Sequence, residues 1–340
     1  MFFPKVPALE NGKREDESMM MMEKGEWDNG TSLLEFLLLG SGNVPSLQAP
    51  LFLLSLIIYL VTIIVNILIV VLLVAEQHLH TPMYFFLGNL SSLETCYSST
   101  ILPQLLASFL TGNRTISAHG CMAQFYAFGS FVTTECYLLT AMSYDRYLAI
   151  CQPLLDASLM TWNICLQMAA ASWLTGLGFS SVVTVFLSQL QFCGHREIDH
   201  FFCDFIPLLE LTCSNTRLIT AIAFALCFLS IVFSFVFTLA SYVCIIAAIL
   251  RVPSSMGRQK AFSTCSSHLI IVTVFYGTLF IVYMMRRTAP LRQLNKMLSS
   301  FYTRLTPLVN PLACTLRNRE IREALRTGLR KALTSTQSSW

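Results

Sequence analysis

An adjacent acid and base are the first candidates for chemistry in this sequence. Asp145 and Arg146, followed by Tyr147, stand at the end of a long apolar stretch. Charged residues make up only 12% of the chain and hydrophobic residues 54%, and charges at or within a membrane are costly and usually functional. Such a pair can hold the guanidinium at rest and release its donors to a partner's helix end. The alternative is a static salt bridge at a membrane edge.

Two further acids, Glu94 and Glu135, lie deep within apolar segments. Buried carboxylates require a cation, a proton or a network of hydrogen-bond donors, because a bare pair is prohibitively costly. The sequence leaves two interpretations open. Either the two acids hold a structural sodium ion, or one of them is protonated and hydrogen-bonded. We expect no other cofactor.

A lone cation, Arg304, interrupts the last apolar segment. Residues three or four apart share one face of a helix, so Arg304 aligns with Pro307 and Leu308, more than a turn away from Asn310. Three roles remain open for Arg304. It can bind an acidic or carbonyl ligand, pair with a buried Glu, or point along a water-filled gap.

Cysteine and histidine gather between residues 193 and 203. Cys193, His195, His200 and Cys203 are residue types that bind zinc. Of the 12 cysteines in the chain, however, four fall in or beside polar connections and suit disulfides in an oxidising compartment. These four are Cys121, Cys193, Cys203 and Cys213.

Long apolar segments position these residues. The mean hydropathy is +0.61, and a membrane-spanning helix needs about 20 predominantly apolar residues. Seven segments qualify, which predicts an all-α membrane protein with a seven-transmembrane helix bundle; the net charge of +3 is too small to indicate nucleic acid. The predicted spans are approximately 51–75, 83–107, 118–148, 164–188, 217–250, 260–285 and 298–316.

The distribution of Lys and Arg predicts the orientation in the membrane. The segment after the last span is basic, as is the connection between the fifth and sixth spans, and both are predicted to be cytoplasmic. Arg286, Arg287, Arg292 and Lys296 give a contrary signal, but the glycosylation sequons at Asn29 and Asn113 favour an extracellular N-terminus. A third match, Asn89, lies inside a span. We expect a multi-pass protein of the plasma membrane.

The predicted organisation has three parts. Residues 1–50 form an extracellular segment, 51–316 the seven-helix domain, and 317–340 a cytoplasmic tail. No cleavable signal peptide is apparent, so the first span is expected to act as the targeting signal. In the tail, an apolar residue recurs at every fourth position, which predicts a short amphipathic helix on the anionic inner leaflet. The apolar positions are Ile321, Leu325, Leu329 and Leu333.

Several longer strings of residues resemble those of one family. The segment from Met142 to Cys151 resembles the third-helix signature of olfactory receptors, which are rhodopsin-like G-protein-coupled receptors. Similar strings occur in the family's order from Leu34 to about Leu329. They are residues 35–40 at the entry to the first helix, 79–87 in the first intracellular loop and the start of the second helix, 260–269 and 275–278 in the sixth, and 307–311 and 316–318 in the seventh.

The resemblance implies a function for these residues. A small odorant would bind within the bundle, and the opposite face would activate a heterotrimeric stimulatory G protein of the olfactory type and raise cyclic AMP. Asp145, Arg146 and Tyr147 would form the switch together with Tyr242, Asn310 and Pro311, and Tyr242 would contact Arg146 in the active state. Glu94 and Glu135 would lie where related receptors hold sodium, near Asn66 and Asn310.

The resemblance also implies covalent features. The family pairing is Cys121 with Cys203 and Cys193 with Cys213, which favours disulfides over zinc. Asn29 would carry a glycan, and Met22 resembles the usual start of these receptors. Three residues depart from the family pattern: Cys314 replaces a Tyr, Asp156 stands where Tyr is usual, and Arg304 occupies an apolar position.

We expect a ligand pocket between the outer halves of the third, fifth, sixth and seventh helices, under the second outer loop, and helical spacing selects the inward-facing residues of the third and sixth helices. It is mainly apolar with a few hydroxyls, as small organic ligands require, although each residue also suits ordinary helix packing. Together with Arg304, the predicted lining is Phe128, Val132, Thr133, Phe205, Leu226, Ser230, Tyr276, Leu279, Phe280 and Tyr283.

Two other functions fit some of these features. Intramembrane charges favour a transporter or proton carrier, but the sequence lacks the internal repeat that many transporters have. Cys314 and Asp156 favour a receptor that folds but signals poorly. We find no nucleophile–base pair and no glycine-rich phosphate loop, so the sequence does not favour an enzyme.

Overall fold

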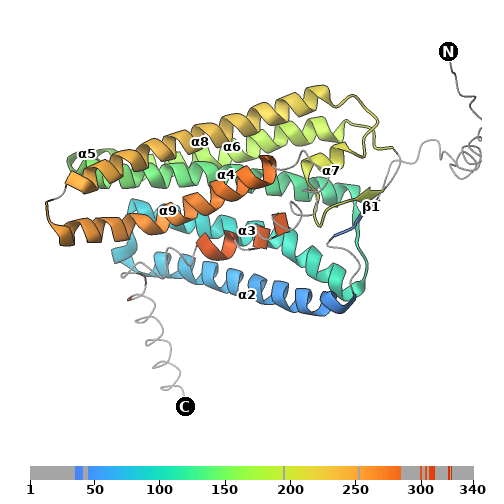
Figure 1. The fold of residues 1–340 in the computed structure, drawn as a ribbon, viewed down its shortest axis with the longest axis horizontal. Coiled ribbons are helices and arrows are strands. Elements are labelled where there is room, and N and C mark those ends of the chain that lie inside the picture. Colours follow the sequence, from blue (N-terminus) through green and yellow to red (C-terminus); the bar gives the residue numbers. More distant parts are fainter. Residues whose placement is uncertain are drawn as a thin grey trace, which may run out of the picture. The chain divides into compact units, whose positions relative to one another are not determined.

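The computed structural model describes residues 35–40, 45–193, 196–251, 253–284, 299–300, 303–304, 306–310, 321 and 323. Six long helices account for most of them, and their bounds agree closely with the first six predicted spans (Figure 1). The remaining helices, η1 (Gln77–Leu79), α5 (Pro153–Leu159) and α7 (Phe205–Leu209), are short. The long helices are α2 (Pro45–Ala75), α3 (Pro82–Thr111), α4 (Ala118–Cys151), α6 (Trp162–Ser188), α8 (Arg217–Arg251) and α9 (Ser255–Met284).

The last predicted span and the tail are described only in part. Residues 299–300, 303–304 and 306–310 are helical, and so are Ile321 and Glu323. We refer to these described residues between 299 and 310 as the last helix. The other residues of the predicted seventh span and of the amphipathic tail lie outside the described part of the chain.

Three of the described helices are long and apolar enough to cross a membrane. They are Gln48–Ala75, Trp162–Ser188 and Arg217–Arg251, and a shorter apolar stretch runs from His268 to Phe280. Helices α3 and α4 have the required length but contain buried polar residues, among them Ser91, Glu94, Ser98, Thr134 and Glu135. Polar side chains of this kind face the interior of a bundle rather than lipid.

Large apolar side chains cover the outward faces of α2 and α8. Ile64 in α2 is 62% exposed and Phe228 in α8 is 66% exposed. A soluble protein rarely exposes contiguous apolar surface on this scale. The pattern is that of helices surrounded by lipid.

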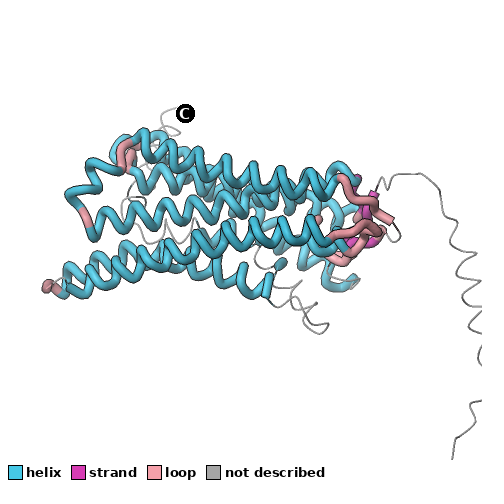
Figure 2. The backbone as a smooth tube through the Cα atoms, turned by 90° about the horizontal axis from the view of Figure 1, so that it is seen from above, coloured by secondary structure: helices cyan, strands magenta, loops and turns pink. Residues whose placement is uncertain are grey.

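Helix α4 lies at the centre of the packing. It contacts α3, α6, α8 and α9, and Figure 1 and Figure 2 show two side views of the bundle, turned by 90° from each other, in which the long helices run across the picture. The approach to α6 is close: a Cβ atom added at Gly176 would lie 2.5 Å from the carbonyl oxygen of Ser130. Glycine is therefore required at this crossing.

A small β-sheet, which the sequence did not predict, lies at one end of the bundle. β1 (Glu35–Leu38) is its central strand, with β2 (Thr115–Ser117) antiparallel on one side and β3 (Glu197–Ile198) parallel on the other. Glu35 pairs with Ser117, and Leu37 pairs with Glu197. The sheet joins the segment before α2 to the connection between α3 and α4, which contains β2, and to the connection after α6, which contains β3. We call this end of the bundle the sheet end.

Residues 35–40 were expected to precede the first helix, and in the structure they do so as the strand β1 followed by a turn. The segment is extended because its backbone bonds to other connections: the Leu37 N–H donates to Arg196 O at 2.7 Å, and the Leu39 N–H donates to Ile198 O at 2.9 Å. Phe36 is buried and packs edge-on against Phe192, with ring centroids 5.5 Å apart. The strand ends before Gly40, whose φ of +61° is in the left-handed region.

Candidate functional site

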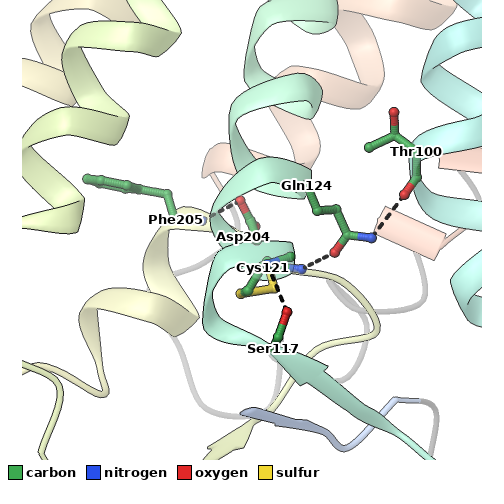
Figure 3. The surroundings of a disulfide bond; sticks show 8 residues. Thr100, Ser117, Cys121, Gln124, Asp204 and Phe205 are labelled. Carbon is green, nitrogen blue, oxygen red and sulfur yellow. Dashed lines mark hydrogen bonds between the residues drawn. A yellow bond between two sulfur atoms is a disulfide. The ribbon is translucent and has the colours of Figure 1, made fainter. Parts of the chain in front are cut away.

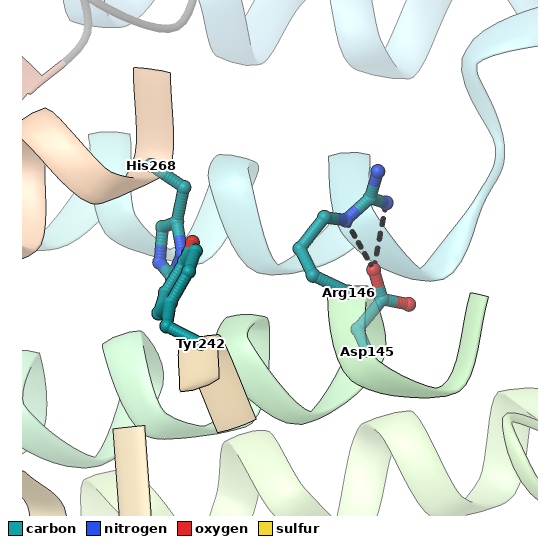
Figure 4. Close-up of polar contacts among 4 residues, drawn as sticks. All are labelled: Asp145, Arg146, Tyr242 and His268. Atoms are coloured by element: carbon teal, nitrogen blue, oxygen red, sulfur yellow. Dashed lines mark hydrogen bonds and ion pairs between the residues drawn. The ribbon is translucent and has the colours of Figure 1, made fainter. Parts of the chain in front are cut away.

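The predicted switch lies at the end of α4 that is farther from the sheet, which we call the Arg146 end. Two guanidinium nitrogens of Arg146 donate to one oxygen of Asp145: the Nη2–Oδ2 distance is 2.7 Å and the Nε–Oδ2 distance is 3.1 Å (Figure 4). The Asp145 residue is only 3% exposed. Charge-assisted bonds to a buried carboxylate are strong, so this arrangement corresponds to the held state of the guanidinium.

A second polar contact lies nearby and joins α8 to α9. The Tyr242 hydroxyl and His268 Nδ1 share a hydrogen bond, and both side chains are buried (Figure 4). The sequence analysis predicted that Tyr242 contacts Arg146 in an active state, which is a different state from this one. His268 occurred in the sequence analysis only within a family string, because its partner is 26 residues away.

Tyr147 is half-buried beside the ion pair. Its hydroxyl accepts a hydrogen bond from Gln152 Nε2 at 3.3 Å, and its ring stacks on that of Tyr144 with centroids 6.5 Å apart. Pro311, another predicted switch residue, lies outside the described residues.

The two buried acids meet at one amide. Asn310 Nδ2 donates to Glu135 Oε1 at 2.8 Å and also to Glu94 Oε1. Glu94 and Glu135 are each 1% exposed. Asn310 therefore joins α3, α4 and the last helix in the interior, as the predicted proximity of these residues requires.

Asn66 provides a further contact to the last helix. Its Nδ2 donates to Pro307 O at 3.2 Å. Glu94 Oε2, Asn66 Oδ1 and Asn310 Oδ1 have no hydrogen-bond partner among the described residues. Oxygen atoms of this kind suit a hard cation, so the donor set is compatible with sodium.

Arg304 is 8% exposed and buried in the bundle. Its Nε is without a partner, and no hydrogen bond or ion pair links its guanidinium to any described residue. Of the three roles considered from the sequence, pairing with Glu94 or Glu135 is not realised in this structure.

Two disulfides lie at the sheet end. Cys121 in the first turn of α4 bonds to Cys203, across 82 residues (Figure 3), and Cys193 bonds to Cys213. These are the pairs that the family resemblance implies. Because both cysteines of the zinc alternative are in disulfides, that alternative is wrong; no cluster of three or more metal-binding side chains occurs among the described residues.

Gln124, which the sequence analysis did not single out, supports the same junction. Its Oε1 accepts from the Cys203 N–H at 3.0 Å, and its Nε2 donates to Thr100 O at 3.1 Å (Figure 3). The side chain thus links α3, α4 and the disulfide-bonded connection. The sequence could have indicated this role, because Gln124 follows Cys121 by three residues and residues three or four apart lie on the same face of a helix.

The predicted pocket residues fall into three groups. Phe128, Ser230, Tyr276 and Leu279 are buried, whereas Val132, Thr133, Phe205 and Leu226 are half-buried. Phe128 packs against Phe202 of the disulfide-bonded connection, with ring centroids 4.8 Å apart. The side chain of Tyr283 lies outside the described residues.

Phe280 is the exception, and its predicted inward position is wrong. The side chain is 67% exposed. Residues four apart on a helix are offset by roughly 40°, and Tyr276 is already at the edge of the buried face that Ile271, Phe275 and Leu279 define. The offset turns Phe280 outward, where lipid would surround it.

A hollow of about 510 Å³ lies on the sheet-end half of α3. Its lining includes Thr100, Gln104 and Thr111, and also Asn113 and Thr115 of the second sequon, but none of the predicted ligand residues. Thr115 Oγ1 donates to Asn113 Oδ1 at 2.9 Å in this sequon. Asn89 instead bonds to Trp173 inside the bundle, and Asn29 lies outside the described residues.

Comparison with known proteins gives a consistent result. A family model described as "Olfactory receptor" matches residues 54–331. The human protein named Olfactory receptor 5AP2 is 42% identical over 308 residues, covering 91% of this chain and 98% of its own length. Human Olfactory receptor 6B1 is 44% identical, covering 88% of this chain and 96% of its own length.

Proposed function

The chain belongs to the olfactory receptor family, whose members are seven-transmembrane G-protein-coupled receptors rather than enzymes, and on that premise we propose a specific signalling route. A small odorant binds toward the sheet end, and the Arg146 end then activates a stimulatory G protein of the olfactory type. The product of that route is a rise in cyclic AMP.

The observation that carries this proposal is the held guanidinium of Arg146. Asp145 is buried and satisfies two of its nitrogens. When this pair separates, the guanidinium offers a planar fork of donors, and the unsatisfied carbonyls at the end of a partner's helix accept them. Tyr242 would then leave His268 and contact the freed Arg146.

The ligand acts at a distance from this pair. Cys121 and Arg146 are 25 residues apart on one helix, a separation of roughly 38 Å. A ligand shifts the equilibrium only through its difference in affinity for the resting and active states. The pocket residues that support such a site are Phe128, Val132, Thr133, Phe205, Leu226, Ser230, Tyr276, Leu279, Tyr283 and Arg304.

The proposed orientation puts the sheet end outside the cell. Disulfides persist in oxidising surroundings, and the two bonds lie at this end. The N-terminus, with a glycan on Asn29, is then extracellular and the tail from 317 to 340 is cytoplasmic. The protein would reside in the plasma membrane.

We also propose that Glu94 and Glu135 hold a sodium ion together with oxygens of Asn66 and Asn310. A bound cation would offset the buried negative charge and favour the resting arrangement of α3, α4 and the last helix. Sodium-dependent basal signalling supports this site, and basal signalling that does not change when sodium is replaced by a large organic cation contradicts it.

The experiment that tests the function is a cyclic AMP assay in cells that express the chain from Met22. A broad odorant panel is applied, and the wild type is compared with Arg146→Ala at equal surface expression. We expect at least one odorant to raise cyclic AMP through the wild type only. An equal response in Arg146→Ala, or odorant-driven substrate flux without cyclic AMP, contradicts the proposal.

A further inference from the structure

We propose that Arg304 is an anion-binding residue and that the ligands of this receptor are small carboxylates with an apolar body. This inference rests on the proposed receptor function and deepens it by naming the chemical class of ligand.

The first step is the energetic problem that Arg304 presents. It is the one Lys or Arg that is buried among the side chains the structure describes. Buried charges are normally paired, because the loss of hydration is otherwise uncompensated. No described residue forms a hydrogen bond or ion pair with this guanidinium. An anion from outside the chain would supply the missing partner.

The second step concerns the acids that could compete for Arg304. Glu94 and Glu135 are fixed by the amide of Asn310. Arg304 precedes Asn310 by six residues, which places it roughly 9 Å closer to the sheet end along a helix. The buried acids and the buried base are thus on different levels of the bundle. Arg304 is on the side from which the proposed ligand enters.

The third step is the match between guanidinium and ligand. A guanidinium presents parallel N–H donors that fit the two oxygens of a carboxylate, and charge-assisted bonds of this type are strong. Of the buried residues of the proposed pocket, Phe128, Tyr276 and Leu279 are apolar or aromatic, and Ser230 adds one hydroxyl. They suit the body of the ligand and not its charged group.

The sequence provides a separate observation. Between α9 and the last helix, residues 285–298 contain four cations, Arg286, Arg287, Arg292 and Lys296, and no acid. In the proposed orientation this connection is extracellular. Positive charge on the face from which a ligand arrives raises the local concentration and association rate of anions, so extracellular cations would favour anionic ligands over neutral ones.

The test uses matched sets of compounds with the same carbon chain: a carboxylic acid, its methyl ester and the corresponding alcohol. Straight-chain sets from four to ten carbons and phenyl-substituted sets are assayed for cyclic AMP at pH 7.4, where the acids are ionised. We expect the acid of at least one set to be at least tenfold more potent than its ester and alcohol.

The decisive comparison is between variants of Arg304. In Arg304→Leu, the potency of that acid should fall at least about 30-fold, because one partner of a buried charge pair is lost. Arg304→Lys retains the charge and should lose less. Arg196→Gln is the matched control, since Arg196 is exposed at the sheet end, and it should leave potency unchanged. Surface expression is measured for every variant.

The outcomes separate the two proposals. If neutral odorants activate the wild type and no acid does, or if acid potency is unchanged in Arg304→Leu, the anion site is wrong and the receptor function stands. If Arg304→Leu does not reach the surface, equal potency of acid, ester and alcohol on Arg304→Lys and the wild type also refutes the anion site. A wild type at the surface that answers no acid and no neutral odorant contradicts the receptor function itself.

Discussion

The two ends of the bundle are held together in different ways. At the sheet end, two disulfides and a three-stranded sheet connect the segment before α2 with the connections around α4 and α6. At the Arg146 end, the ion pair lies within α4 alone, and a Tyr242–His268 hydrogen bond joins α8 to α9.

This difference indicates which end can move. The disulfides and the hydrogen bonds of the sheet restrict the relative motion of the segments at the sheet end. A ligand that binds there is therefore expected to leave the arrangement of these segments unchanged. The polar contacts at the Arg146 end are each worth only about 0.5–3 kcal/mol, which is comparable to the coupling free energy of typical allosteric transitions. Ligand binding can therefore reverse them.

The largest effect is expected from opening the Cys121–Cys203 disulfide. Cys121→Ser removes a bond that closes an 82-residue separation, and the loss of such a bond lowers the free energy of unfolding by about 4 kcal/mol. Surface expression, measured by flow cytometry, should be nearly abolished. Cys96→Ser is the control, because Cys96 is an exposed free cysteine of α3. Normal surface levels of Cys121→Ser would contradict a fixed sheet end.

The next effect concerns the ion pair. Asp145→Asn removes the charge that holds Arg146, so the active state becomes more populated. Basal cyclic AMP should rise at least about fivefold, since hydrogen bonds between charged groups contribute about 1.5–3 kcal/mol. The double variant Asp145→Asn with Arg146→Ala should return to the background of untransfected cells. Unchanged basal cyclic AMP in the single variant would show that Asp145 does not keep Arg146 in its resting position.

A smaller effect is expected at the contact between α8 and α9. His268→Phe keeps an aromatic ring but removes the partner of the Tyr242 hydroxyl, so the separation of the two helices costs about 1 kcal/mol less. Basal cyclic AMP should rise two- to tenfold. Tyr242→Phe loses both the resting contact and the proposed contact to Arg146, and its maximal odorant response should fall. A higher maximal response in Tyr242→Phe would argue against the active-state contact.

The smallest effect tests the strand at the sheet end. Gly40→Ala places a side chain at a φ of +61° where nothing lies within 4 Å, so only the backbone conformation is penalised, by about 1 kcal/mol. Gly178→Ala, in helix α6 with equally open surroundings, should be neutral or stabilising. The melting temperature of the purified receptor should fall in Gly40→Ala and should stay unchanged or rise in Gly178→Ala. A melting temperature of Gly40→Ala that is not lower than that of the wild type would show that the turn after β1 does not contribute to stability.

The six long helices were predictable from the sequence because long, predominantly apolar segments are typical of membrane spans, even where buried polar residues interrupt them as in α3 and α4. Gly40 and the strand before it were not predictable, since β1 depends on pairing with residues 115–117 and 197–198, far along the chain. The need of Glu94 and Glu135 for partners could be anticipated from their burial, and their proximity to Asn310 from the family resemblance, whereas the Tyr242–His268 contact was not anticipated. Phe280 was wrongly predicted to face inward because neighbouring helices determine how wide the buried face of a helix is. The spacing of residues along the sequence does not give that width.

The most direct test of the account measures distances at both ends of the same receptor. Spin labels on unnatural amino acids, which spare the disulfides, are placed at Leu154 and Met256 for the Arg146 end and at Leu110 and Leu218 for the sheet end; all four side chains are exposed. Pulsed electron spin resonance then compares the receptor with and without a saturating agonist. We predict that the Leu154–Met256 distance increases by several ångströms while the Leu110–Leu218 distance stays unchanged. An unchanged distance at the Arg146 end, or a larger change at the sheet end, would contradict the account.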